Sequence, residues 1–164
     1  MYNWVVFLHV LGSMSFMLAH GGTAVMTLML KKERDPEHLR SLLDLSAYSQ
    51  PALWATLLLI VLSGIAAGIM GRWWGRGWIW ASLIILIAIS LYMMSESGAQ
   101  YHQLRRVLGL PYFEGSQKKV VPGLPPAPIE EIHRAQADLR PMRPTAVGLG
   151  GILVILALMM FKPF

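Results

Sequence analysis

Two histidines stand inside the first hydrophobic stretch of the chain, which runs from Trp4 to Leu30 and contains no Asp, Glu, Lys or Arg. His9 and His20 are eleven positions apart, which places them about 20° from each other around a helix and about 16 Å apart along its axis. Neutral imidazole is a suitable axial ligand for haem iron. Ionisable side chains inside a membrane are costly and mark functional sites. The sequence therefore makes His9 and His20 the candidate cofactor-binding and metal-binding residues.

Three interpretations of these histidines stay open. The first is binding of haem b, in which a second axial ligand must come from methionine (Met17, Met93 or Met94), from His102, or from another subunit, or else be absent. The second is hydrogen bonding of both rings to Ser, Thr or Tyr on neighbouring helices. The third is copper, because the chain has eleven methionines and thioethers suit Cu(I). The methionines of the first stretch are spread around it, however, and the chain has no cysteine.

The other polar residues of this stretch follow the histidines around the helix. Ser13, Thr23 and Thr27 lie within about 40° of the same direction. An unpaired polar group that faces hydrocarbon costs several kcal/mol. We therefore expect this polar stripe to face protein and not lipid.

The composition indicates a membrane protein. Of 164 residues, 55% are hydrophobic and 14% are charged, whereas soluble domains have about a quarter charged residues. Runs of about 20 apolar residues span a bilayer, and they occur at about 4–30, 52–70, 77–97 and 145–161. The predicted fold is all-α, a four-transmembrane-helix bundle that forms one integral membrane domain over residues 1–164.

The predicted loops at about 31–50 and 98–143 carry most of the positive charge. Of the 14 Lys and Arg residues, all but Arg72, Arg76 and Lys162 lie there. Cytoplasmic loops of membrane proteins are rich in Lys and Arg, so both loops are predicted to be cytoplasmic and both termini to be outside a bacterial inner membrane. This asymmetry accounts for the net charge of +5 without a nucleic-acid partner.

Shorter elements are expected within the loops. A surface helix begins at Pro36 after an Asp35 N-cap, Pro51 opens the second span, and the segment 129–140 forms a helix that lies along the membrane. Residues 109–128 contain five prolines and are predicted to be irregular. Four tryptophans between positions 73 and 80 predict a belt at the membrane interface.

Small residues predict where helices approach closely. Gly64 and Gly68 form a GxxxG motif in the second span, and Gly148, Gly150 and Gly151 form a similar patch in the fourth. Motifs of soluble enzymes such as GxxxxGK[ST], HExxH and GxSxG are absent from the sequence. His38, His102 and His133 fall in the predicted loops, where we expect them to be exposed to solvent. The sequence thus gives no reason to expect an enzyme that acts by itself.

Several motifs together resemble the CopD-like superfamily of small bacterial membrane proteins, in particular its "predicted integral membrane protein" branch. They are Leu8-His9-Val10-Leu11-Gly12 in the first span, the Arg- and Leu-rich segment before Pro51, the Gly-rich second span, the Trp-flanked third span and the Lys162-Pro163 ending. A more distant likeness is to the four-span, haem-binding protoporphyrinogen oxidases, which also start with Leu-His and end in Lys-Pro.

The resemblance implies that His9 matches the first-span histidine of those oxidases. Phe16 falls where they tend to have tryptophan, Ser82 where they have a lysine, and the basic residue late in their first span has no equivalent before Lys31. These departures argue against the oxidase activity and leave His9 as an inherited haem ligand. His20 has no counterpart in the comparison.

The leading prediction is a bacterial inner-membrane protein that binds haem b or serves as an accessory subunit of a redox or photosynthetic assembly in electron transport. Its partners would be the lipid bilayer and other membrane subunits or further copies of itself. The alternatives are a cofactor-free structural subunit that stabilises a membrane assembly, and a copper or small-molecule transporter.

Overall fold

The apolar runs of the sequence fold as long helices. The computed structural model describes residues 1–114 and 119–163. The elements are α1 (Tyr2–Lys32), α2 (Pro36–Gly71), α3 (Gly77–Val107), β1 (Tyr112–Glu114), β2 (Lys119–Val121), α4 (Ile129–Ala137) and α5 (Met142–Phe161). Within these described ranges, four helical stretches are long and apolar enough to cross a membrane, and they contain α1, α2, α3 and α5. The chain is therefore a four-pass helical membrane protein.

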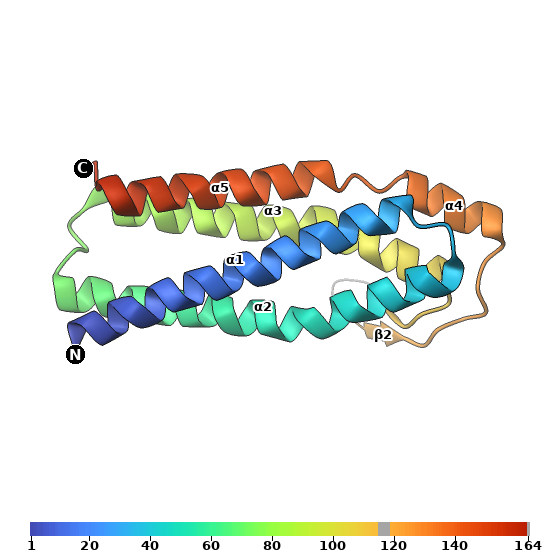
Figure 1. The fold of residues 1–164 in the computed structure, drawn as a ribbon, viewed down its shortest axis with the longest axis horizontal. Coiled ribbons are helices and arrows are strands. Elements are labelled where there is room, and N and C mark those ends of the chain that lie inside the picture. Colours follow the sequence, from blue (N-terminus) through green and yellow to red (C-terminus); the bar gives the residue numbers. More distant parts are fainter. Residues whose placement is uncertain (115–118, 164) are drawn as a thin grey trace.

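The four long helices form two pairs. α1 packs along α2, and α3 packs along α5, so that the pairs lie side by side (Figure 1). Glycines allow the close approach within each pair, because a Cβ atom at Gly12 would lie 3.2 Å from side-chain carbons of Leu59 and Ile60 in α2, and one at Gly151 would overlap Ile89 of α3. Small residues at such positions are typical of helix pairs in lipid.

Both termini lie at the same end of the bundle as the turn between α2 and α3 (Figure 1). Aromatic rings join the chain ends to this turn: the Tyr2 ring meets Trp73 edge to face at 5.8 Å, and Lys162 Nζ lies 4.8 Å from the centroid of the Trp73 ring and 5.9 Å from that of Trp78. Arg72 ends α2 in the left-handed conformation, with φ of 55°. We call this the tryptophan end.

The buried core of the protein lies at the opposite end. Here α4 packs against the ends of α3 and α1. Together with the start of α2 they bury nine apolar side chains, which we call the leucine cluster: Leu30, Leu39, Leu43, Leu104, Val107, Leu108, Ile132, Ala135 and Leu139. Both of the Lys- and Arg-rich segments, which are partly helical in α2, α3 and α4, meet at this end, which we call the basic end. Lys118, one of their basic residues, lies outside the described residues.

Hydrogen bonds to helix termini hold the basic end together. Gln136 is 2% exposed, and its Nε2 donates to the carbonyl oxygen of Leu30 at 2.6 Å and to that of Glu33. Both acceptors lie at the end of α1, where helix carbonyls lack partners within the helix. Arg105 ties the end of α3 to α2 through the carboxylate of Asp44 and the carbonyl oxygen of Leu43, both at 3.2 Å. The helix ends are thus satisfied by tertiary contacts.

The turn between α1 and α2 is short because two acids organise its backbone. The N–H groups of Asp35 and Arg34 donate to the Glu33 carboxylate at 3.1 and 2.7 Å, and these bonds hold the pKa of Glu33 below its usual range. The Asp35 carboxylate accepts from the N–H of Glu37 at 3.0 Å, which is the predicted N-cap. Pro36 occupies the first turn of α2, as the sequence indicates.

The prediction of a separate surface helix before the second span is wrong. α2 runs unbroken through Pro51, although proline removes one hydrogen bond from a helix interior. Leu39, Leu43 and Ser46 are buried on the first half of α2, and their packing at the basic end holds this half in line with the span. Tertiary packing therefore outweighs the local preference of Pro51 for a first turn.

Other boundaries also differ from those predicted. Residues 98–107 continue α3 and do not belong to a loop. In the proline-rich segment, β1 and β2 pair as an antiparallel hairpin in which Tyr112 faces Val121, because aromatic and β-branched residues favour strands. α4 is present as predicted. Its residues Ile132 and Gln136 are buried against the rest of the protein, whereas the sequence predicts a helix that lies along the membrane. α5 starts at Met142, three residues before the expected span, since proline is tolerated in a first helical turn.

Candidate functional site

His9 is fixed against α2. Its Nδ1 lies 2.9 Å from the carbonyl oxygen of Ile60 and 3.3 Å from the hydroxyl of Ser63. A carbonyl oxygen only accepts, so Nδ1 carries the proton and Nε2 carries the lone pair. A Cβ atom at Gly64 would lie 3.0 Å from Cε1 of the ring, so this glycine allows the close approach of His9 to α2. The predicted hydrogen bond to a serine of a neighbouring helix is therefore present for His9.

His20 meets a different helix. A Cβ atom at Gly148 of α5 would lie 2.6 Å from His20 Nε2, so the ring occupies space that the glycine leaves open. The Phe16 ring stacks on the imidazole with a centroid distance of 5.8 Å and an interplanar angle of 5°. Among the described residues, the buried Nε2 atom has no hydrogen-bond partner. The predicted bond to Ser, Thr or Tyr is thus not found for His20.

The remaining residues of the stripe form hydrogen bonds either to another helix or within α1. Thr27 lies 2.6 Å, oxygen to oxygen, from the hydroxyl of Tyr101 in α3, while Ser13 and Thr23 donate to carbonyl oxygens one turn earlier in α1. The stripe therefore meets α2 at His9, α5 at His20 and α3 at Thr27. This change of partner was not predicted, because α1 crosses the other helices at an angle (Figure 1) that hydrophobic periodicity does not encode.

The two histidines fit a bound haem differently. Histidines that ligate metals usually donate their second ring N–H to a carbonyl or carboxylate, which fixes the ring and leaves the other nitrogen free for the metal. His9 has this arrangement with Ile60. At His20, Nε2 faces the backbone of α5 at Gly148, so a ligand on this atom would require α5 to be displaced. The position of His9 is suited to an axial ligand, whereas the position of His20 is suited to packing against α5.

In the described part of the chain, no group of three or more His, Asp or Glu side chains is arranged to hold a metal ion such as copper. The methionines of α1 point in different directions, and Met14, Met17 and Met29 are exposed. They are suited to contact with lipid or another helix.

The three loop histidines differ in exposure. His38 is exposed as predicted, with its ring near Glu33 and Asp35. His102 and His133 are half-buried at the basic end, so the prediction that they face solvent is wrong. They are covered because α4 packs over the end of α3, a contact between segments that are distant in the sequence.

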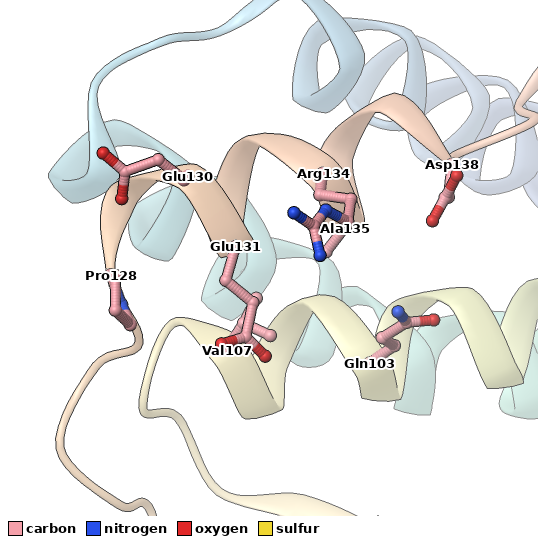
Figure 2. A pocket seen from close by; sticks show the side chains of 8 residues that line it. All are labelled: Gln103, Val107, Pro128, Glu130, Glu131, Arg134, Ala135 and Asp138. Carbon is pink, nitrogen blue, oxygen red and sulfur yellow. The ribbon is translucent and has the colours of Figure 1, made fainter.

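An open pocket of about 340 Å³ lies between α3 and α4. Figure 2 shows that Glu131 extends toward Val107 of α3, whereas Glu130 points away from it. Arg134 and Asp138 complete the charged part of the lining. The side chains shown do not converge on one point, and Arg134 offsets part of the acidic charge. We therefore treat this pocket as a solvated surface feature.

Comparison with protein-family models, with curated proteins and with solved structures finds no match for this chain. The class of protein thus rests on the chain itself, and it is a four-pass helical membrane protein in which His9, His20 and Thr27 contact neighbouring helices. The resemblance to the CopD-like superfamily stays a prediction.

Proposed function

We propose that the protein is a subunit of the bacterial cytoplasmic membrane that binds one b-type haem through His9 and belongs to a membrane redox assembly. The observation that carries the proposal is the bond from His9 Nδ1 to the carbonyl oxygen of Ile60. This bond orients the ring and leaves the lone pair of Nε2 available for a metal. The first-span Leu-His of the haem-binding oxidases supports the same choice of ligand.

The residues around His9 have separate roles in this proposal. Ile60 holds the ring tautomer, and Ser63, which is 7% exposed, accepts a longer second bond from Nδ1. Gly64 provides the space that the ring occupies beside α2. A haem bound at Nε2 would supply a reversible one-electron couple.

Replacing His9 by alanine is expected to abolish the Soret absorption band of protein purified from haem-supplied cells, because the axial nitrogen is lost. His20→Ala is the matched control and is expected to retain the band, since Nε2 of His20 faces α5. Addition of imidazole to the His9→Ala protein is expected to restore the band in part. Circular dichroism verifies that each variant keeps its helices. A wild-type protein that stays colourless after haem supply, or a band lost only in His20→Ala, would contradict the proposal.

A cofactor-free structural subunit is the second candidate, and a specific observation favours it. The polar stripe already uses its side chains to connect α1 with the three other spans, through Ser63, Gly148 and Tyr101. In that case the wild-type protein has no Soret band, and His9→Ala only lowers the temperature at which the protein unfolds. The absorption spectrum of the wild type therefore separates the two candidates.

The orientation in the membrane is part of the proposal, with the basic end in the cytoplasm and both termini outside. The chain has no cysteine, so single cysteines can report on each side. We expect a membrane-impermeant maleimide to label Gly75→Cys at the tryptophan end in intact spheroplasts, and Ser41→Cys at the basic end only after permeabilisation. Both positions are exposed. The reverse labelling pattern would show that the orientation is opposite.

A further inference from the structure

A second pocket, of about 420 Å³, lies where α1 ends and α5 begins. Its lining consists of Leu28, Lys31, Lys32, Arg140, Pro141, Met142 and Arg143. Four of these seven residues are cationic, and none is acidic. We call it the basic pocket.

The charges of the basic pocket are not neutralised by the protein. In the described ranges, none of its four cationic side chains forms an ion pair with Asp or Glu. Lys31 Nζ donates to the carbonyl oxygens of Leu139 at 2.5 Å and Ala137 at 3.4 Å, which are neutral acceptors. Like charges brought together in this way repel one another unless an anion lies between them.

The position of the two arginines gives an independent reason to expect an anion. Cations are favourable at helix C-termini and unfavourable at N-termini because of the helix dipole. Lys31 and Lys32 lie in the last turn of α1, where their charge is favourable. Arg140 and Arg143 instead flank the start of α5, whose first turn contains no acid. The positive-inside rule places cations on one side of a membrane. It does not explain why Arg140 and Arg143 lie at the N-terminus of α5, which is the positive end of the helix dipole.

The apolar part of the lining indicates what kind of anion fits. Leu28 lies near the end of the α1 span, and Met142, at the start of α5, is 66% exposed. The pocket therefore opens where a membrane-spanning helix emerges from the hydrocarbon region, at the depth of lipid headgroups. A ligand there meets cations on one side and apolar side chains on the other.

We propose that the basic pocket binds the phosphate headgroup of an anionic phospholipid, with an acyl chain along Leu28 and Met142. Arginine matches phosphate oxygens with two parallel N–H donors, so Arg140 and Arg143 supply the principal contacts, and Lys31 and Lys32 add positive charge. Basic pockets between membrane helices are suited to such headgroups. This site is independent of the haem proposal, because its residues do not contact His9 or His20.

The test uses full-length protein in a neutral detergent, with lipid adducts counted by native mass spectrometry. We expect phosphatidylglycerol or cardiolipin to bind and to raise the unfolding temperature, and phosphatidylcholine to do neither. The double variant Arg140→Gln/Arg143→Gln is expected to bind phosphatidylglycerol roughly tenfold more weakly or worse. The matched control is Arg106→Gln/Arg134→Gln, which removes two exposed arginines outside the basic pocket and should leave binding unchanged.

Three results would overturn the proposal. Equal binding of phosphatidylcholine would show general lipid contact without a headgroup site. Stabilisation by inorganic phosphate alone, at the same concentration as the lipid, would show a site for free phosphate. Equal loss of binding in the control variant would show a diffuse effect of charge. Circular dichroism of each variant in detergent verifies that a loss of binding does not reflect unfolding.

Discussion

Replacing Gln136 by glutamate is expected to lower the free energy of unfolding by about 3–5 kcal/mol, the usual cost of leaving a charge buried without a partner. The side chain keeps its size, but its Nε2 donor becomes a carboxylate oxygen that faces the carbonyl oxygens of Leu30 and Glu33. The negative end of the α1 dipole adds to the repulsion. Thermal unfolding in mild detergent, followed by circular dichroism, is expected to show a midpoint lower by roughly 10 °C.

The pH dependence of the same variant follows from the burial of the carboxylate. Burial raises the pKa of a carboxyl above its value in the unfolded chain, so the folded state binds the proton more tightly. The defect should therefore be small at about pH 5 and larger at about pH 8. The control is Gln103→Glu on α3, which is exposed and should be near neutral. If Gln136→Glu is as stable as the wild type at both pH values, then Lys31 or water reaches the carboxylate, and the capping role of Gln136 is wrong.

Replacing Gly109 by alanine is expected to cost about 2–3 kcal/mol. Gly109 follows α3 with φ of 75°, a conformation that glycine adopts readily and other residues do not. A Cβ atom here would also collide with the carbonyl oxygen of Leu124. The close contact between Gly109 and the backbone of Leu124 lets the N–H of Ala127 reach the carbonyl oxygen of Val107 at 2.8 Å. This hydrogen bond positions the start of α4. The variant should unfold at lower temperature and expose the segment 122–128 to protease first.

Gly150 gives the matched control for that experiment. A Cβ atom at Gly150 meets nothing within 4 Å, and the residue lies inside α5. Alanine there should leave stability unchanged or raise it by up to about 1 kcal/mol, because glycine is a poor helix former. Equal stabilities of the two alanine variants would show that the contact between Gly109 and the backbone of Leu124 is not tightly packed.

The sequence predicts the membrane-spanning part of this fold well. Hydropathy alone places the four apolar helices, and the distribution of Lys and Arg predicts that the segments 31–50 and 98–143 share one end. The inward direction of His9, His20 and Thr27 also follows from their positions around one helix. These are local properties, since each depends on residues within a few turns of one another.

The parts that were not predicted depend on contacts between distant segments. Pro51 lies inside α2 because Leu39 and Leu43 are held by α3 and α4, and nothing near Pro51 in the sequence shows this. The same packing covers His102 and His133. The partners of His9 and His20 follow from the crossing of α1 over α2 and α5, although Gly64 and Gly148 were recognisable as places of close approach. The role of Gln136 had no local signal, because its two acceptors are more than a hundred residues away.

Eight of the nine side chains of the leucine cluster, all but Leu30, lie outside the apolar runs 4–30, 52–70, 77–97 and 145–161. The cluster joins all the long helices except α5, which follows α4 after a short connection. Apolar side chains that pack outside the hydrocarbon region are driven together by water and not by lipid. Extraction into detergent changes the surroundings of the spans but leaves this driving force in place. The order of the helices can therefore survive solubilisation even where contacts between the two helix pairs loosen.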